Sequence, residues 1–308
     1  EKVSFIWTVA DLLRGDFRES EYHKFILPFT LIRCLDQALA DTRMKVLETA
    51  SRYASSPKSS RHQMLLRASS RTFYNTSGLS FTGLRGDSDN VASNLTNYVS
   101  GFSRNVRDIL DHLRFDLQVE RLDKANLLRR VHGEFAKLDF DPTRSGMGEI
   151  FDEVVQWCAE ETTETAGEHF TPPDVQRLMA ALLFAGDDKA LSDTTEGRTV
   201  YDPACGTGGL FSAVEKHVHR IAPDKRLDVL GQELNAEAYA ICAARLLVRG
   251  LDPSGVELGN SLSEDGHSNA LADYVISHPP FGLAWSEAED AVRSEHQQKG
   301  YAGRFGPG

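Results

Sequence analysis

The sequence lacks the features of membrane and secreted proteins. It has no apolar run of about 18 residues that could span a bilayer, so we expect no membrane partner. Its N-terminus has neither a basic start before an apolar stretch nor an initiator methionine, which argues against a signal peptide and suggests that the first residues are missing. Its four cysteines lie far apart and form no C-x-x-C pair, which argues against zinc and a disulfide framework. We therefore expect a cytoplasmic protein without a metal site.

Positive charge is scarce and unevenly distributed. The 308 residues carry a net charge of -11, which disfavours unaided binding to DNA phosphates. Residues 1–145 hold 22 Lys and Arg against 18 Asp and Glu, or +4, whereas the rest of the chain holds 12 against 27, or -15. If DNA is the substrate, the first half or a partner subunit must supply the cationic surface. The alternative is an acidic protein that does not bind nucleic acid.

The length favours two domains, and the hydrophobic pattern separates them. In the first half, apolar residues recur at helical spacing over residues 5–48 and again over residues 91–138. Residues 51–90 are rich in Ser, Arg and Gly and are predicted to be rich in loops. A turn-rich segment at residues 141–146 ends this half. We therefore predict a helical N-terminal domain over residues 1–140.

Arginines accumulate along the second of these helical stretches. They could contact DNA phosphates, but aspartates interleave with them, so a solvated charged surface is the alternative. The arginines are Arg104, Arg107, Arg114, Arg121, Arg129 and Arg130.

The second half, residues 141–308, alternates between strand and helix patterns. This alternation is typical of a parallel sheet covered by helices, in a doubly wound α/β domain. Such sheets bind ligands at the carboxyl ends of their strands, so the informative residues should follow each strand directly. Strands are predicted at residues 199–201, 227–230, 256–258 and 273–276, and helices at 147–160, 172–184, 208–218 and 235–249.

A glycine-rich turn follows the first predicted strand. Its sequence, Asp202-Pro203-Ala204-Cys205-Gly206-Thr207-Gly208-Gly209, lets a ligand approach the backbone closely and leaves free N–H groups there. No Gly-Lys-Ser/Thr follows, which disfavours a nucleoside triphosphate. After the second strand, Glu233 stands where a carboxylate could accept hydrogen bonds from both ribose hydroxyls. An adenosine-containing ligand fits both positions, and a structural turn beside a surface acid is the alternative.

The segment after the fourth predicted strand is the most specific feature. It reads Ser277-His278-Pro279-Pro280-Phe281-Gly282. It resembles the tip of the fourth strand in amino-methyltransferases that act on nucleic acids, where Asn or Asp precedes Pro-Pro and an aromatic residue. The upstream segment Gly167-Glu168-His169-Phe170-Thr171-Pro172 resembles the cofactor-contacting segment of the same enzymes in their gamma arrangement.

The resemblance extends to the modification (methylase) subunits of type I restriction-modification systems, an N6-adenine DNA methyltransferase family. It implies that the second domain is a Rossmann-like S-adenosylmethionine-dependent methyltransferase domain. Seven strands are usual there, so the four predicted strands imply a truncated sheet with an unpaired edge. The implied partners are DNA, a specificity subunit and a restriction subunit. Segments that look like this family are residues 6–15, 26–36, 147–151 and 231–235.

The resemblance also assigns roles to individual residues. The target adenine would leave the duplex stack and lie against Phe281. The side chain at position 278 and the Pro279 carbonyl, in the motif that Pro280 completes, would accept the protons of its amino group. The cofactor would be covered by Glu168, His169, Phe170, Thr171, Pro172 and Pro173, held at its methionine end by Asp202, Gly206, Thr207, Gly208 and Gly209, bound at its ribose by Glu233, and approached at its adenine by Asn260.

Position 278 departs from the family pattern. An asparagine amide accepts a hydrogen bond at every pH, whereas a histidine ring accepts one only when it is neutral, and about a quarter of exposed imidazole is protonated at pH 7. Two hypotheses follow: His278 serves a site-specific DNA adenine-N6 methyltransferase, or the chain is a catalytically impaired, cofactor-binding scaffold of the same kind of complex. A protein-glutamine methyltransferase has a similar motif, but the helical first half argues against it.

Overall fold

The structure of the chain is a computed structural model that describes residues 4–86, 90–140, 143–161, 171–187, 191, 197–282 and 284–306. Two compact units share these residues. One consists of residues 1–167 with 243–253, and the other of residues 168–242 with 254–308. The division falls within helix α13, Ala236–Val248. No helix among the described residues has the length and apolar character that crossing a membrane requires.

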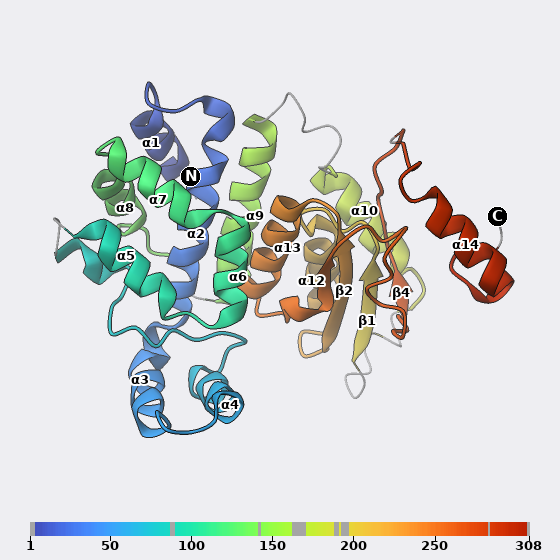
Figure 1. Cartoon of the computed structure of the whole chain (residues 1–308), viewed down its shortest axis with the longest axis horizontal. Coiled ribbons are helices and arrows are strands. Elements are labelled where there is room, and N and C mark those ends of the chain that lie inside the picture. Colours follow the sequence, from blue (N-terminus) through green and yellow to red (C-terminus); the bar gives the residue numbers. More distant parts are fainter. Residues whose placement is uncertain are drawn as a thin grey trace. The chain divides into compact units, whose positions relative to one another are not determined.

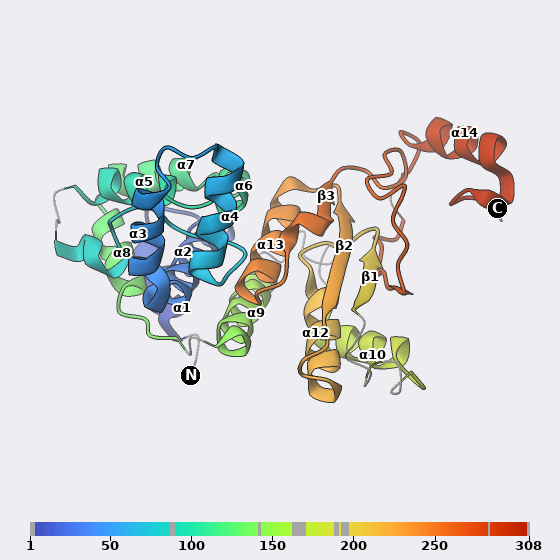
Figure 2. The same ribbon diagram turned by 90° about the horizontal axis from the view of Figure 1, so that it is seen from below.

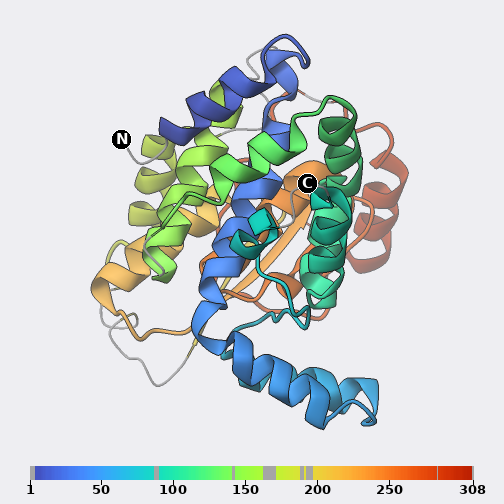
Figure 3. The same ribbon diagram turned by 90° about the vertical axis from the view of Figure 1, so that its left-hand side faces the viewer.

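The first unit is a group of helices packed around α2, which lies at its centre in Figures 1 and 3. Every α2 residue from Phe25 to Asp36 is buried, so this helix is apolar nearly all round. The Phe29 ring lies 5.4 Å from that of Phe135 and 5.2 Å from that of Phe115. The helices are α1 (Ser4–Leu13), α2 (His23–Ala38), α3 (Arg43–Arg52), α4 (Lys58–Ser69), α5 (Val91–Ser100), α6 (Arg104–His112), α7 (Phe115–Lys124), α8 (Leu128–Phe135) and α9 (Arg144–Glu161).

Helix α4 corrects the prediction of a loop-rich stretch over residues 51–90. Its apolar residues are few and do not recur at helical spacing, and only Leu65, Ala68 and Ser69 are buried. The helix is formed by packing against α3, through a small core of Val46, Ala50, Leu65 and Ala68. A tertiary contact of this kind has no signal in the periodicity of α4 itself.

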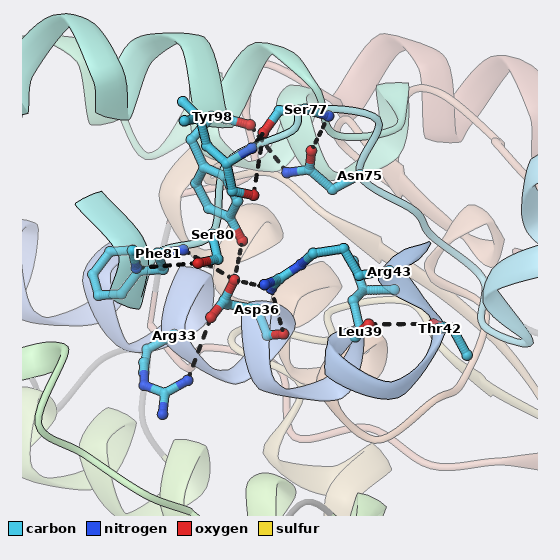
Figure 4. Close-up of polar contacts among 12 residues, drawn as sticks. Arg33, Asp36, Leu39, Thr42, Arg43, Asn75, Ser77, Ser80, Phe81 and Tyr98 are labelled. Atoms are coloured by element: carbon cyan, nitrogen blue, oxygen red, sulfur yellow. Dashed lines mark hydrogen bonds and ion pairs between the residues drawn. The ribbon is translucent and has the colours of Figure 1, made fainter. Parts of the chain in front are cut away.

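A buried carboxylate joins several elements of this unit (Figure 4). Asp36 Oδ1 accepts hydrogen bonds from the Tyr98 hydroxyl at 2.8 Å and from the Phe81 backbone N–H at 3.0 Å. The same oxygen pairs with Arg43, while Oδ2 lies 3.6 Å from Arg33 Nη1. The Asp36 side chain therefore connects α2 with α3, with α5 and with the turn at Phe81.

The second unit contains a four-stranded parallel sheet in the order β3-β2-β1-β4. The predicted strands are confirmed as β1 (Arg198–Asp202), β2 (Leu227–Glu233), β3 (Val256–Leu258) and β4 (Tyr274–Val275). Val200 and Val229 are neighbours in the register and are buried. The predicted α/β class is confirmed. Helices α10 (Pro173–Leu183) and α12 (Gly209–Ile221) pack against each other, and α14 (Glu289–Lys299), which the sequence did not predict, follows the sheet.

The strand order reverses beside β1. From β1 the chain moves outward to β2 and β3 (Figure 2), and then returns to place β4 on the other side of β1 (Figure 1). In open α/β sheets, ligands bind at the carboxyl ends of the strands, at the point where the order reverses. The segments that follow β1, β2 and β4 therefore meet where this topology predicts a ligand.

Candidate functional site

The glycine-rich turn after β1 is a close-fitting loop. Gly206 and Gly208 have φ angles of +55° and +78°, which glycine adopts without strain. A Cβ atom on Gly208 would lie 2.8 Å from Cys242 Sγ, so the position has no room for a side chain. Helix α12 begins directly afterwards, and its first N–H groups are at the turn. The turn therefore presents backbone rather than side chains.

Two thiols pack under this turn. Contact with the Cys242 thiol and burial raise the pKa of the Cys205 thiol well above its ordinary range. The Cys205 backbone N–H also donates to the Gln232 carbonyl at 3.0 Å, which ties the turn to β2. Both cysteines are buried, so they act as apolar packing groups and not as nucleophiles.

Glu233, at the end of β2, is joined to the turn directly. The Gly206 N–H donates to Glu233 Oε2 at 2.8 Å, and the Asn235 N–H donates to Oε1 at 2.7 Å. Each carboxylate oxygen thus accepts one backbone hydrogen bond and keeps further acceptor capacity. The structure brings together the turn and the carboxylate that the sequence singled out, with the carboxylate held in a fixed orientation.

Asp202, the last residue of β1, lies beneath the turn and is buried. Its Oδ1 accepts the Ala204 N–H at 3.0 Å, whereas Oδ2 has no hydrogen-bond partner among the described residues. Burial raises the pKa of this carboxyl to about 7, against the lowering effects of Ala204 and Ser277. The Ser277 hydroxyl is likewise buried, and it lies close enough to Asp202 to lower the pKa of that carboxyl. A buried carboxyl and a buried hydroxyl thus lie together at the carboxyl ends of β1 and β4.

The motif after β4 is next to this turn because β4 pairs with β1, and the Ile276 N–H extends that pairing to the Tyr201 carbonyl at 2.9 Å. Pro279 and Pro280 are exposed, as is His278. Phe281 is 79% exposed, and its ring centroid lies 5.7 Å from that of His278 in an edge-on arrangement. An exposed aromatic face beside a polar ring can stack on a planar ligand.

Thr171 contacts the motif from the segment that precedes α10. Its Oγ1 lies 2.9 Å from His278 Nδ1. Pro172 and Pro173 start the helix, and Gln176, one turn further on, donates to the Thr171 carbonyl and lies against Gly209. The start of α10 is thereby linked to both the motif and the glycine turn.

The remaining predicted residues lie differently. Asn260 follows β3, and the Gly259 N–H pairs with the Glu233 carbonyl at 2.9 Å. The Asn260 side chain, however, caps its own turn by accepting the Leu262 N–H at 3.0 Å. Thr207 is half-buried within the glycine turn. Glu168, His169 and Phe170 lie outside the described residues.

Sequence reasoning gave no role to Gln176, Asn235 or Ser277. Ser277 directly precedes the motif, and its position at the end of a strand was a usable signal. The contacts of Gln176 and Asn235 depend on tertiary approach, which no local pattern reports. Nowhere in the described ranges do three or more His, Cys, Asp or Glu side chains gather as metal ligands would.

Comparison with known proteins agrees with this arrangement. The sequence model of the family described as N-6 DNA Methylase matches residues 143–304, and that of the HsdM N-terminal domain matches residues 2–135. The type I restriction enzyme MjaIX methylase subunit of Methanocaldococcus jannaschii is 22% identical over 298 residues, which are 90% of this chain and 50% of that protein. The EcoEI methylase subunit of Escherichia coli is 24% identical, over 65% of this chain and 42% of its own length.

A solved structure shares the fold. The methyltransferase subunit of a type I restriction-modification system from Streptococcus thermophilus superposes with a TM-score of 0.71 at 18% identity, and covers 95% of this chain and 66% of that chain. The chain spans about half the length, or less, of the curated relatives named above. The family resemblance that the motifs predicted is confirmed: this chain belongs to the N-6 DNA methylase family, with an HsdM N-terminal domain preceding the methylase domain.

Proposed function

We propose that this chain is the cofactor-binding and methyl-transferring part of a DNA adenine-N6 methylase subunit of a type I restriction-modification complex. The observation that carries the proposal is the convergence of the glycine turn, Glu233 and residues 277–281 at the carboxyl ends of β2, β1 and β4. The partners would be DNA, a specificity subunit and a restriction subunit. The HsdM N-terminal domain favours this function over protein-glutamine methylation.

The site fits S-adenosylmethionine, the methyl donor of this family. When bound, this cofactor supplies a methyl group on a positively charged sulfonium. The turn at Gly206–Gly209 would lie against it through backbone, because three of its four residues are glycines. Glu233 would accept the ribose hydroxyls with its remaining lone pairs, and the buried Asp202 carboxyl would interact with the cationic end. Thr171 to Pro173 would close one side.

The pKa of Asp202 predicts how the affinity for this cofactor changes with pH. A cationic ligand favours the ionised carboxylate, and a carboxyl with a pKa of about 7 is mostly protonated at pH 6 and mostly ionised at pH 8. We expect the affinity for S-adenosylmethionine to rise about tenfold between pH 6 and pH 8. Calorimetric titration at several pH values measures this change.

Two variants separate this effect from general pH sensitivity. Asp202→Asn should flatten the dependence of cofactor affinity on pH. Asp228→Asn, which changes a partly exposed carboxylate paired with Arg226, should leave that dependence unchanged. A wild-type affinity for S-adenosylmethionine that does not change between pH 6 and pH 8 would contradict the proposed contact between Asp202 and the cofactor.

The same carboxyl affects the stability of the ligand-free protein. The contribution of Asp202 should make the native state less stable as pH rises from about 4 to 7, because folded Asp202 retains a proton that the unfolded chain releases.

Base chemistry at the motif depends on the proton of His278. If the Thr171 hydroxyl donates to Nδ1, the neutral ring carries its hydrogen on Nε2 and offers the base no acceptor. If Nδ1–H donates to Thr171 instead, Nε2 can accept a proton from the adenine amino group. The direction of the hydrogen bond between Thr171 and His278 therefore decides whether the ring can accept a proton from the base. Phe281 would stack on the target base, and the Pro279 carbonyl would accept the second amino proton.

Replacement of His278 by asparagine tests the proposed function. An amide accepts hydrogen bonds in every protonation state of the site, so His278→Asn should raise methyl transfer to adenine N6 in the assembled complex by about tenfold or more. Tritium transfer to duplex DNA, followed by nucleoside analysis, measures the rate and the methylated atom. His219→Asn, on the exposed side of α12, is the matched control and should change neither rate nor cofactor affinity. If His278→Asn binds cofactor but shows no gain, the scaffold hypothesis is favoured instead.

A further inference from the structure

Residues 43–71 form the most cationic segment of the chain. They contain seven Lys and Arg and only one acidic residue, Glu48, which gives a net charge of +6 in a protein whose total is -11. By contrast, residues 104–135 contain seven Lys and Arg and six Asp and Glu. The cations of residues 43–71 are Arg43, Lys45, Arg52, Lys58, Arg61, Arg67 and Arg71.

This segment is a helical hairpin. Helices α3 and α4 lie side by side and extend beyond the other helices of the first unit in Figures 1 and 3. Val46 and Ala50 of α3 pack against Leu65 and Ala68 of α4, with Tyr74 beside them. An apolar seam inside the hairpin leaves the long polar side chains to point outward.

Four of these cations form no ion pair among the described residues. Arg43 pairs with Asp36, and Arg61 donates to the Ala50 carbonyl. Lys45, Arg52, Lys58 and Arg67 are exposed, and none of them has a carboxylate partner in the part of the chain that the structure describes. Among the arginines of residues 104–130, Arg104 pairs with Asp108 and Arg121 with Glu21 at 2.9 Å. The others are exposed and unpaired in the described part of the chain, but the six acidic residues of residues 104–135 lie among or beside them. Unpaired, exposed cations are available to an anionic partner.

A cavity of about 320 Å³ opens at the carboxyl end of α4. Arg67 lines it, and so does Thr72, whose hydroxyl is buried without a partner among the described residues. Ser70, with a φ of +53°, turns the chain at its rim. An arginine and a serine at this end of the hairpin add groups of the kinds that bind phosphate oxygens.

We propose that the α3–α4 hairpin binds the phosphate backbone of duplex DNA, without reading its sequence, through Lys45, Arg52, Lys58 and Arg67. Each phosphate that a cation neutralises releases condensed counterions, so binding should weaken steeply with salt. The identity of the polyanion rests on the proposed DNA methylation. The hairpin supplies the cationic surface that the acidic methylase domain lacks.

Salt-dependent binding tests this surface. The whole chain is titrated against a fluorescent 30-base-pair duplex, an experimental length of roughly three helical turns, at salt concentrations from about 50 to 200 mM. A variant with Lys45→Gln, Arg52→Gln, Lys58→Gln and Arg67→Gln should bind at least about 100-fold more weakly at the lowest salt, and its slope of log K against log salt should fall by about 3 to 4. The matched control, Arg104→Gln, Arg107→Gln, Arg129→Gln and Arg130→Gln, loses the same charge and should lower the slope by less than about 1.

Three outcomes would overturn the proposal. The hairpin variant could keep the wild-type slope, the control could lose as much as the hairpin variant, or the wild-type chain could bind polyglutamate but not the duplex, which would indicate an acidic protein partner. Titration with S-adenosylmethionine runs in parallel and should be identical for all three proteins. A wild-type chain that binds no S-adenosylmethionine but shows the expected slope of log K against log salt would contradict the proposed function. It would not contradict DNA binding by the hairpin.

Discussion

Asp36→Ala is expected to destabilise the first unit by about 3 to 5 kcal/mol, because it removes one partner from a buried ionic cluster. Asp36 is 3% exposed and accepts hydrogen bonds from Tyr98, Phe81 and Arg43 (Figure 4). Its loss would leave the Tyr98 hydroxyl and the Phe81 N–H without an acceptor, and would leave Arg33 and Arg43 without their carboxylate.

Hydrogen exchange of α2 and α5 amides, followed by mass spectrometry, reports on this unit without averaging over the second one. Tyr98→Phe keeps the ring and removes only the hydroxyl, so it should cost about 1 to 2 kcal/mol. Asp123→Ala removes an exposed carboxylate on α7 and should cost less than about 0.5 kcal/mol. If Asp36→Ala exchanged like Asp123→Ala, the cluster would not stabilise the unit.

Gly208→Ala is expected to lower the affinity for S-adenosylmethionine by at least about 100-fold, or about 2.7 kcal/mol. The φ of +78° costs an alanine about 1 kcal/mol, and its Cβ would lie 2.8 Å from Cys242 Sγ and 3.3 Å from Cys242 Cα. The Cα atom cannot rotate away as a side chain can. The turn must shift instead, and its N–H groups and the Gly206 to Glu233 hydrogen bond move with it.

Gly186→Ala is the matched control. Gly186 has a φ of +87°, but no atom lies within 4 Å of the position that its Cβ would occupy. It therefore carries the same conformational strain without the collision, and its cofactor affinity should equal that of the wild type. A Gly208→Ala protein that binds S-adenosylmethionine within about threefold of the wild type would show that the turn does not hold the ligand closely.

The strands, and the convergence of the segments that follow them, were predictable from the sequence for one physical reason. In a parallel sheet, all carboxyl ends meet at one edge, so residues far apart in the chain must converge if each directly follows a strand. This logic placed Gly206 near Glu233, which the structure joins by a hydrogen bond of 2.8 Å, and it placed His278 beside the same turn. Neither inference required any knowledge of side-chain packing.

What the sequence did not show depends on contacts between side chains. Helix α4 has few apolar residues and forms against α3, and α14 has no buried residue to mark it. The link between Thr171 and His278 crosses 107 positions of the chain. The cluster at Asp36 joins Asp36 and Tyr98, which lie 62 positions apart in the chain. No local sequence pattern connects the two residues. The local sequence pattern predicts which face of a helix or strand a residue lies on, but not which distant residue it contacts.

The charge of a surface also depends on features that the net charge of each half of the chain does not show. The halves differ by sign, as the sequence showed, yet the arginines of residues 104–130 are partly neutralised by Asp108 and Glu21. The hairpin of residues 43–71 carries fewer acids, and its exposed cations have no such partners among the described residues. The local balance of acidic and basic residues, rather than the number of arginines, decides which surface can bind an anion.

The most direct test of the cofactor site is calorimetric titration of the chain with S-adenosylmethionine at pH 8, together with a Glu233→Ala variant. Glu233 is held by the Gly206 and Asn235 N–H groups, and it is the carboxylate proposed to bind the ribose. We expect saturable binding at one site per chain for the wild type and at least about tenfold weaker binding for the variant. Folded wild-type protein that binds no S-adenosylmethionine, or a variant that binds as tightly as the wild type, would contradict the proposed cofactor site.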